Sequence, residues 1–260
     1  MILAIVQARV SSSRLPGKVL KPILNKPMIV HQIDRIKNSK LINKIVLATS
    51  ENSSDDALVE VCSKYEIEVY RGSLENVLER FYKCAKNYVP EQIIRLTGDC
   101  PLIDWNIIDR TVELHLIENN DYTSNTLEPT YPDGLDVEVM SYNALEMAYR
   151  NARLPSEKEH VTPYIYNHKE LFKVGCLKNN IDLSGLRWTV DETEDFEVIT
   201  QIYETLFPKN PKFLLEDILI FLNRNPGIVK INSLFKRNEG MLKSLGKEKM
   251  ERRIFKWRRF

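Results

Sequence analysis

Short apolar runs alternate with amphipathic helical patterns through the first half of the chain. Residues 2–6 are wholly apolar, which is typical of a strand buried on both faces of a sheet. Similar strand patterns cover residues 44–50, 67–70 and 93–97, and apolar side chains recur at helical spacing over residues 28–36, 58–65, 77–85 and 107–116. Strands that alternate with helices of about 10–15 residues form βαβ units, so this half predicts a mainly parallel sheet.

The second half of the chain is less regular. Residues 136–140 alternate as a half-exposed strand does, and further strands are predicted near residues 172–176 and 186–190. Helical spacing covers residues 141–152, 158–168 and 196–206, and Pro208 and Pro211 close the last helix. The chain has no internal repeat and no linker rich in Gly or Ser. We therefore predict one α/β domain over residues 1–240 and a basic C-terminal extension over residues 241–260.

The composition is that of a globular protein without strong charge bias. Of 260 residues, 43% are hydrophobic and 28% are charged, and the net charge is +1, so no nucleic-acid partner is expected. No segment approaches the roughly 18 apolar residues of a membrane span, and the apolar N-terminus lacks the basic region of a signal peptide. The four cysteines are far apart and show no zinc-binding spacing. We expect a cytoplasmic protein with reduced thiols.

Several nucleotide-binding and hydrolytic classes lack their motifs here. No two glycines stand as Gly-x-Gly, which excludes the dinucleotide-binding fingerprint. Ser12 stands where the first glycine of a P-loop belongs, and Val19 follows Lys18 where a P-loop needs Ser or Thr to bind magnesium. His-Glu-x-x-His and Gly-x-Ser-x-Gly are also missing, so zincins and α/β-hydrolases are excluded.

A polar segment over residues 7–18 directly follows the first buried strand. In an open parallel sheet, loops at the carboxyl ends of the strands line the ligand crevice. This loop carries three cations (Arg9, Arg14 and Lys18), three consecutive hydroxyls and a Pro-Gly turn. Charge-assisted donors and free backbone N–H groups in a bent loop suit a polyphosphate. A solvated loop with ordinary surface cations is the alternative that composition leaves open.

From Ala8 to Leu20 the chain reads Ala-Arg-x-x-Ser-x-Arg-Leu-Pro-Gly-Lys-x-Leu. This stretch resembles the signature that opens the nucleotide site of cytidylyltransferases that make CMP-activated sugars, and the whole chain most resembles their SpsF branch. Motifs that are similar to this branch follow in order at residues 72–80, 96–102, 134–138, 159–164, 187–191 and 238–240. The more distant CMP-KDO synthetases share the first motif, the Gly-Asp motif and a late Asp-Thr-x-Glu-Asp, which here reads Asp191-Glu-Thr-Glu-Asp195. Asn76 stands where the branch often carries Asp.

The resemblance implies both a fold and a reaction. The implied fold is a doubly wound, mainly parallel α/β nucleotidyltransferase of the GT-A or Rossmann-like type, with helices on both faces of the sheet. The implied reaction is a Mg²⁺-dependent transfer of CMP from CTP to a sugar or sugar-acid acceptor with release of pyrophosphate, in cell-surface polysaccharide or glycan biosynthesis. Because the family commonly forms dimers, a homodimer is also expected.

Two aspartates are the candidate metal ligands. Asp99 follows the strand at residues 93–97, and Asp191 ends another predicted strand, so both carboxylates should lie at the carboxyl edge of the sheet. Mg²⁺ usually takes one or two carboxylates together with phosphate oxygens and water. A turn or a helix N-cap is the structural alternative for each aspartate. The resemblance implies further that Arg14 and Lys18 neutralise the β- and γ-phosphates and stabilise the leaving pyrophosphate.

Four further positions resemble family positions around the nucleotide. Ala8 and Arg9 are expected to frame the base and the ribose, largely through backbone groups. Ser73 and Arg80 resemble residues near the nucleotide, although Arg80 also fits an exposed helix position.

The candidate acceptor-side residues are Asp136, Glu138, His160 and Arg187. A turn at Asp133-Gly134 would present Asp136 at the entry of a strand, and Glu138 should point to the same face. For Glu138 the alternative is an ion pair with a nearby cation. For His160 it is a helix cap, and for Arg187 it is a structural salt bridge instead of contact with an acidic acceptor.

Two other functions stay open from the residues alone. A glycosyltransferase that uses a nucleotide sugar has a related α/β fold, but its common metal-binding Asp-x-Asp is absent here. A non-catalytic nucleotide-binding partner protein would act through the basic, aromatic tail at residues 252–260. That tail suits an acidic partner or an anionic membrane surface, and a solvated tail or a helix packed on the body is the alternative.

Overall fold

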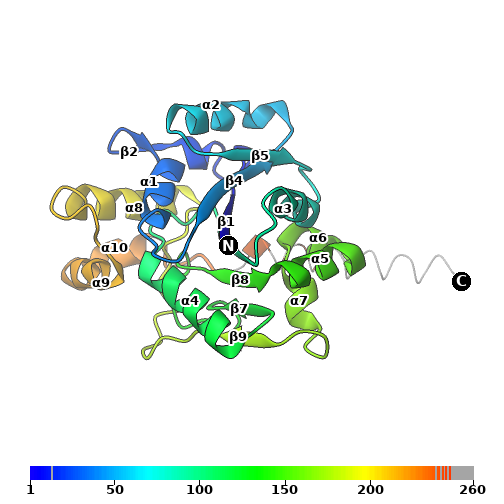
Figure 1. Cartoon of the computed structure of the whole chain (residues 1–260). Coiled ribbons are helices and arrows are strands. Elements are labelled where there is room, and N and C mark those ends of the chain that lie inside the picture. Colours follow the sequence, from blue (N-terminus) through cyan, green and yellow to red (C-terminus); the bar gives the residue numbers. More distant parts are fainter. Residues whose placement is uncertain (13, 238, 241, 243, 245, 247–260) are drawn as a thin grey trace, which may run out of the picture.

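A seven-stranded sheet in the order β5–β4–β1–β6–β8–β7–β9 forms the centre of the protein (Figure 1). The computed structural model describes residues 1–12, 14–237, 239–240, 242, 244 and 246. The strands are β1 (Ile2–Gln7), β4 (Lys44–Ser50), β5 (Val69–Gly72), β6 (Gln92–Thr97), β7 (Tyr122–Ser124), β8 (Glu138–Ser141) and β9 (Val174–Cys176). Neighbours from β5 to β6 are parallel, whereas β8 is antiparallel to both β6 and β7. The predicted mainly parallel α/β sheet is confirmed, with one reversed strand.

Helices cover both faces of this sheet. Successive side chains of β1 point to opposite faces of the sheet, so the hydrophobic core has two parts. Ala4 and Val6 are buried on one face, and Leu3 and Ile5 are buried on the other. The first face packs against α1 (Met28–Ile36), α2 (Asp56–Lys64), α4 (Trp105–Glu118) and α8 (Thr193–Leu206). The second face packs against α3 (Val77–Lys86), α5 (Tyr142–Asn151) and α7 (Pro163–Asn167), and α6 (Pro155–His160) packs on α3. This is the expected doubly wound arrangement.

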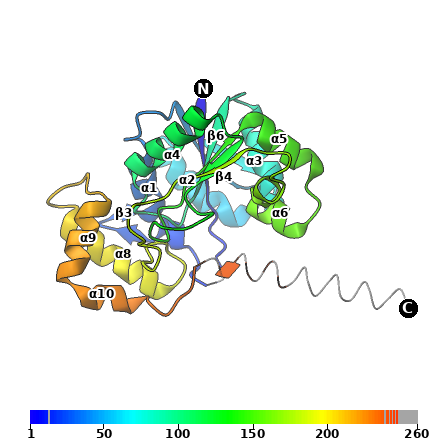
Figure 2. The same ribbon diagram turned by 90° about the horizontal axis from the view of Figure 1, so that it is seen from below.

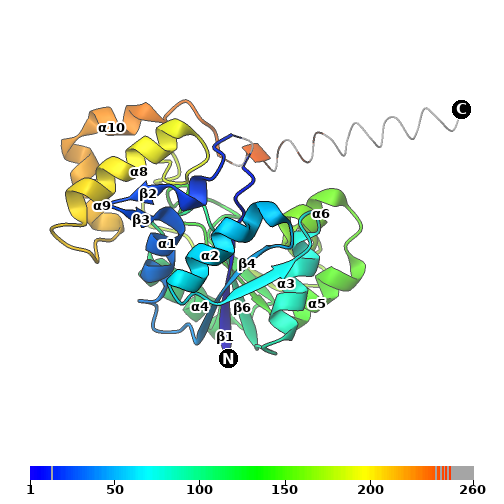
Figure 3. The ribbon, with the colours of Figure 1, turned by 90° about the horizontal axis from the view of Figure 1, so that it is seen from above.

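Three C-terminal helices form a group beside the sheet (Figures 2 and 3). α8 packs against α9 (Leu215–Arg224) and α10 (Pro226–Ile231), and it also contacts the small β2 (Pro22–Ile23) and β3 (Lys26–Pro27) hairpin through β2. The apolar periodicity predicted α8, but α9 and α10 were not identified. In the part of the chain that the structure describes, no helix has the length and apolar composition needed to cross a bilayer.

The strand predicted at residues 186–190 is wrong. An isolated parallel bridge between Asp133 and Arg187 is the only strand-type pairing described there. Trp188 and Val190 are buried, so their apolar pattern reflects packing and not a place in the sheet. Gly134 lies against the backbone of residues 188–189, where a Cβ on it would be 2.4 Å from the backbone nitrogen of Thr189. The φ of Gly134 is +106°, which residues other than glycine rarely adopt. Only glycine suits that crossing.

The helix predicted over residues 158–168 is divided into α6 and α7. Val161 has a φ of +72°, which interrupts the helical backbone, and Pro163 then begins α7. The basic tail at residues 252–260 lies outside the described residues, as does most of the extension predicted at residues 241–260. The domain division at residue 240 and a contact of the tail with an acidic surface therefore stay predictions.

Candidate functional site

One buried aspartate anchors the loop that follows β1. Asp55 accepts hydrogen bonds from the backbone N–H of Val10 (2.7 Å) and from the hydroxyl of Ser50 (2.5 Å). Burial alone would raise the pKa of the Asp55 carboxyl, but the hydrogen bonds from Ser50 and Val10 outweigh burial and lower it. The loop then turns back, because the N–H of Gly17, at φ +70°, donates to the carbonyl of Val10 (3.0 Å). This turn delivers Lys18 to the edge of the sheet.

Lys18 joins two carboxylates at that edge. Its Nζ donates to Asp99 Oδ2 (3.2 Å), Asp191 Oδ1 (2.8 Å) and the carbonyl of Val190 (2.7 Å). Burial would lower the pKa of the Lys18 ammonium, but the charges of Asp99 and Asp191 raise it above its ordinary value. Burial likewise opposes ionisation of Asp99, yet Lys18 and Thr97 lower its pKa to about 2. Lys18 and Asp99 are therefore a charged pair at neutral pH.

Backbone contacts bring the two carboxylates together. Asp99 follows β6 through Gly98. A Cβ on Gly98 would lie only 2.7 Å from the Cβ of Ala8, so the segments after β6 and β1 approach each other closely. The carbonyl of Asp99 accepts a hydrogen bond from the N–H of Val190 (2.8 Å). Asp191 is the next residue, and its carboxylate consequently reaches Lys18 beside Asp99.

The helix cap considered for Asp191 is supplied by Asp195. At the start of α8, Asp195 accepts hydrogen bonds from the backbone N–H groups of Asp191 and Glu192 (2.9 Å each). The side chain of Asp191 instead forms ion pairs with Lys18 and with Arg14 (2.9 Å). Its carboxylate thus lies among the cations of the loop after β1.

Arg14 contacts three carboxylates at once. Its guanidinium lies 2.9 Å from Asp191, 3.3 Å from Glu192 and 3.6 Å from Glu239. Its side chain keeps 27% of its surface exposed, so it is still accessible to a ligand. Arg14 and Lys18 therefore place two cations against the same carboxylate of Asp191.

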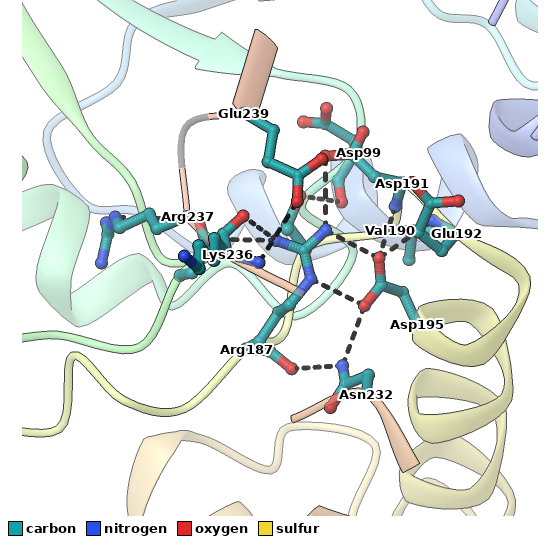
Figure 4. A network of polar contacts seen from close by, with 12 residues as sticks. Asp99, Arg187, Val190, Asp191, Glu192, Asp195, Asn232, Lys236, Arg237 and Glu239 are labelled. Atoms are coloured by element: carbon teal, nitrogen blue, oxygen red, sulfur yellow. Dashed lines mark hydrogen bonds and ion pairs between the residues drawn. The ribbon is translucent and has the colours of Figure 1, made fainter. Parts of the chain in front are cut away.

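Arg187 is the centre of a deeper ion-pair cluster (Figure 4). Its guanidinium donates to both oxygens of Asp195 (2.8 Å each) and to Asp133 (3.0 Å), and only 7% of its side chain is exposed. Asn232 completes the cluster by donating to the carbonyl of Arg187 (3.0 Å) and to Asp195 (2.9 Å). Of the two roles left open for Arg187, these contacts match the structural salt bridge.

Asp136 forms an ion pair with Arg237. Arg237 is not among the candidate site residues predicted from the sequence. Arg237 donates to Asp136 and to the carbonyl of Tyr131 (3.1 Å), and its Nε lies 3.8 Å from Asp133. Burial raises the pKa of the Asp136 carboxyl to about 7, while Arg237 opposes the shift and Asp133 adds to it. No periodicity or motif marks this pair, because it joins segments far apart in the chain.

Glu138 and His160 lie on the same side of the sheet as α6 and α7. Glu138 is buried, pairs with Arg95 of β6, and accepts hydrogen bonds from the hydroxyls of Tyr122 and Thr162 (2.6 Å each). These contacts match the ion pair with a cation that was the alternative for Glu138. His160 is the last residue of α6, and its Nε2 lies 3.1 Å from the hydroxyl of Ser244.

Two arginines lie near the start of α3 without an ion pair to any described residue. Arg9 is exposed in the loop after β1, whereas Arg80 is only 2% exposed and its Nε has no hydrogen-bond partner among the described residues. Burial, followed by the nearby charge of Arg9, lowers the pKa of Arg80 to about 10. The exposed helix position considered for Arg80 is therefore wrong. Its Nη1 donates to the carbonyl of Ser73 (2.9 Å).

Asn76 is the N-cap of α3 and fills this role with a side-chain amide in place of a carboxylate. Its side-chain oxygen accepts a hydrogen bond from the N–H of Glu79 (3.1 Å), and its own N–H donates to the hydroxyl of Ser73 (3.0 Å). Asparagine and aspartate are about equally good N-caps, so the departure from the family pattern at this position leaves the start of α3 intact.

Asp99 and Asp191 are the residues that fit a divalent cation. Lys18 Nζ, a single positive group, lies within 3.2 Å of an oxygen of each carboxylate. Over the described residues there is no cluster of three or more His, Cys, Asp or Glu side chains arranged to enclose a metal ion. Two carboxylates that leave the other positions to phosphate oxygens and water are a ligand set that suits Mg²⁺.

Two small cavities lie apart from these charged residues. One, of about 190 Å³, is lined by His31, Arg35 and Tyr203 among others, and the other, of about 390 Å³, lies between Leu186 and α9 and α10. Neither cavity includes a residue predicted for the site. The candidate site is thus defined by converging charges at the sheet edge.

Several known proteins are similar to this chain over most of its length. A family model described as cytidylyltransferase matches residues 3–241. The spore coat polysaccharide biosynthesis protein SpsF of Bacillus subtilis is 37% identical over 232 residues, which are 86% of this chain and 95% of that protein. The structure of a cytidylyltransferase from Leptospira borgpetersenii is similar with a TM-score of 0.83 at 33% identity, over 88% of this chain and 96% of that one.

A more distant structure shares the fold. It is a CMP:2-keto-3-deoxy-manno-octonic acid synthetase complexed with CTP, with a TM-score of 0.61 at 15% identity. The similarity covers 78% of this chain and 98% of that one. At this level of identity the comparison supports the α/β architecture alone.

Proposed function

Because the chain belongs to the cytidylyltransferase family, we propose that it transfers CMP from CTP to a sugar or sugar-acid acceptor and releases pyrophosphate, with Mg²⁺ as cofactor. The similarity to SpsF over most of both chains supports a place in the biosynthesis of a cell-surface polysaccharide or glycan. A homodimer is the oligomeric state expected for such an enzyme.

The convergence of two cations and two carboxylates at the sheet edge carries this proposal. Lys18 lies within 3.2 Å of both Asp99 and Asp191, and Arg14 lies 2.9 Å from Asp191. The carboxyl edge of a parallel sheet is where such folds bind their ligands. A triphosphate accompanied by a divalent cation needs this combination, because its oxygens require positive charge and the cation requires carboxylates.

The reaction itself asks little covalent chemistry of the protein. The acceptor hydroxyl oxygen forms a bond to the α-phosphorus and its proton is released to solvent, while the bond from that phosphorus to the oxygen shared with the β-phosphate breaks. Negative charge then accumulates on the departing pyrophosphate. Arg14 and Lys18 stabilise this charge with charge-assisted hydrogen bonds, and the loop after β1 fixes their position in advance.

Asp99 and Asp191 would hold Mg²⁺, which when bound supplies positive charge at the phosphate oxygens. A carboxylate must be deprotonated to act as a ligand, and Lys18 favours that state of Asp99 by lowering its pKa to about 2. The hydrogen bond to Asp195 fixes the backbone N–H of Asp191, and the ion pairs with Lys18 and Arg14 hold its carboxylate.

We assign the remaining predicted residues either to the nucleotide side or to the acceptor side of the cluster formed by Arg14, Lys18, Asp99 and Asp191. In this proposal Ala8, Arg9, Ser73 and Arg80 serve the nucleotide. Burial and then the nearby charge of Arg9 lower the pKa of the Arg80 guanidinium, and Arg80 donates to the carbonyl of Ser73 (2.9 Å). Asp136 and His160 serve the acceptor. Glu138 and Arg187 already have buried ionic partners, so we assign them to shaping the acceptor side and to positioning Asp191, respectively.

Calorimetric titration of nucleotides in the presence of Mg²⁺ tests the first half of this proposal. CTP should bind more tightly than UTP, GTP or ATP, and Arg14→Ala should weaken that binding. Pyrophosphate release is then measured with CTP and a panel of neutral sugars and sugar acids. Equal binding of the four nucleotides, or no binding at all, would reject the nucleotide assignment, and selective CTP binding without pyrophosphate release would favour a non-catalytic role.

A further inference from the structure

The chain returns to the candidate site after α10. We call residues 232–237 and 239–240 the C-terminal strap. Asn232 donates to Asp195 (2.9 Å), Arg237 pairs with Asp136, and Glu239 lies 3.6 Å from the guanidinium of Arg14. Figure 4 shows Asn232, Arg237 and Glu239 around the Arg187 cluster. The strap therefore contacts both the proposed nucleotide side and the proposed acceptor side.

Glu239 differs from the other two carboxylates on Arg14. Asp191 and Glu192 belong to the start of α8, where Asp195 accepts hydrogen bonds from both of their N–H groups (2.9 Å each). Glu239 comes from the strap, and its contact with Arg14 is the longest of the three, at 3.6 Å against 2.9 and 3.3 Å. The side chains of Arg14 and Glu239 are 27% and 31% exposed, so solvent screens their attraction.

The three carboxylates around Arg14 outweigh its single positive charge, so together they oppose the approach of a further anion. A triphosphate that approaches Arg14 is repelled by each carboxylate already present, and the repulsion falls when one of them moves away. Asp191 is also paired with Lys18, and the backbone of Glu192 is fixed at the helix start. Glu239 is held to Arg14 at the longest of the three distances, so its attraction to the guanidinium is the weakest, and its Oε1 also accepts a hydrogen bond from the N–H of Lys236 (3.4 Å) within the strap.

We propose that Glu239 is an internal competitor that occupies Arg14 while the nucleotide site is empty and yields it to the phosphates of CTP. This inference rests on the proposed function, because it takes Arg14 to be a phosphate ligand. It adds a regulation of that site: the affinity for CTP is set below the value that Arg14 and Lys18 would give alone.

Isothermal titration of CTP with Mg²⁺ into the wild-type protein and Glu239→Gln tests the proposal. The variant should bind CTP about two- to fivefold more tightly, which is the fold-change expected for loss of a half-exposed ion pair that competes with the ligand. Glu170→Gln is the matched control, because it removes the same charge from an exposed position. Uncharged cytidine should bind the wild type and Glu239→Gln equally, since it places no phosphate on Arg14.

The double variant Arg14→Ala/Glu239→Gln completes the test. If Glu239 acts through Arg14, its substitution changes nothing once Arg14 is absent, so the double variant should match Arg14→Ala. Glu239→Gln that binds CTP no more tightly than Glu170→Gln overturns the competitor role while leaving the proposed function standing. Wild-type protein that binds no CTP overturns the proposed function, and this inference fails with it.

Discussion

At the scale of single residues, Lys18 is the side chain on which the candidate site most depends. It is only 9% exposed, and its ammonium is surrounded by two carboxylates and a carbonyl. A buried charge is tolerated only when it is paired and hydrogen-bonded, and this one is. Lys18 also favours the ionised form of Asp99, together with Thr97, and so supports the charge of a proposed metal ligand.

Substitution Asp99→Asn should reduce turnover at least about a hundredfold while leaving the fold intact, because the amide keeps the shape but loses the charge that holds a divalent cation. Pyrophosphate release at saturating CTP measures turnover, and circular dichroism measures the fold. Asp182→Asn is the control, since that carboxylate lies on the surface and accepts a hydrogen bond from Ser184. A wild-type kcat in Asp99→Asn would contradict the assignment.

Asp136 should make the protein less stable as the pH rises from about 4 to about 7. Burial raises its folded-state pKa to about 7, so in this window the folded state binds more protons than the unfolded state. The free energy of unfolding falls with pH under that condition. Asp136→Asn removes the titrating group, so its stability relative to the wild type should grow between pH 4 and 7 in urea unfolding. A constant difference across the window would refute the shift.

At the scale of elements, the periodic segments were predictable and the irregular ones were not. The strands at the sheet centre are apolar on both faces, and that signal is present in the sequence alone. Residues 186–190 alternate apolar and polar side chains as a half-buried strand does, but Trp188 and Val190 are buried without belonging to a strand of the sheet. The pattern of apolar residues in a short segment indicates which side chains are buried, but it does not indicate whether a neighbouring strand pairs with the backbone of that segment.

The site was partly predictable for the same reason. Asp99 and Lys18 follow strands or loops whose places in a parallel sheet are known, so their meeting could be expected from order along the chain. Arg237 and Asp195 act through partners that no periodicity reveals, namely Asp136 and the N–H groups that begin α8. Homologous sequences with co-varying positions would be the signal that could find them.

The crossing of Gly134 over Thr189 should be sensitive to a single methyl group. Gly134→Ala would place a Cβ 2.4 Å from a backbone nitrogen at a φ of +106°, so we expect a loss of about 2 kcal/mol or more in the free energy of unfolding. Gly185→Ala is the matched control, because nothing lies within 4 Å of the added Cβ. Denaturant unfolding of both variants gives the comparison, and equal losses would contradict the strain argument.

At the scale of the whole molecule, the site joins segments from almost the entire described chain. Lys18, Asp99 and Asp191 come from the first, second and last thirds of the described residues, and Arg237 comes from the strap. A ligand that bridges these segments binds the folded state only. It must therefore raise the stability of the whole domain by mass action.

CTP with Mg²⁺ should raise the Tm by about 5–10 °C when present at roughly one hundred times its Kd, because such binding adds about 2.7 kcal/mol to a chain of this size. Differential scanning calorimetry gives the shift. Cytidine at the same concentration should give a smaller shift, since it lacks the phosphates that engage Arg14 and Lys18. A shift from cytidine as large as that from CTP would place the nucleotide elsewhere.

The pairing of Lys18 with Asp191 also has a consequence for synthesis of the chain. The two residues are separated by 173 positions. At about 5–20 residues per second, a ribosome needs roughly 10 to 35 s to travel from one to the other. During that time the N-terminal strands can assemble, but the ammonium of Lys18 lacks one of its two carboxylates. Under the proposed function, a nascent chain that has not yet reached Asp191 therefore lacks one of the two carboxylates proposed to hold Mg²⁺.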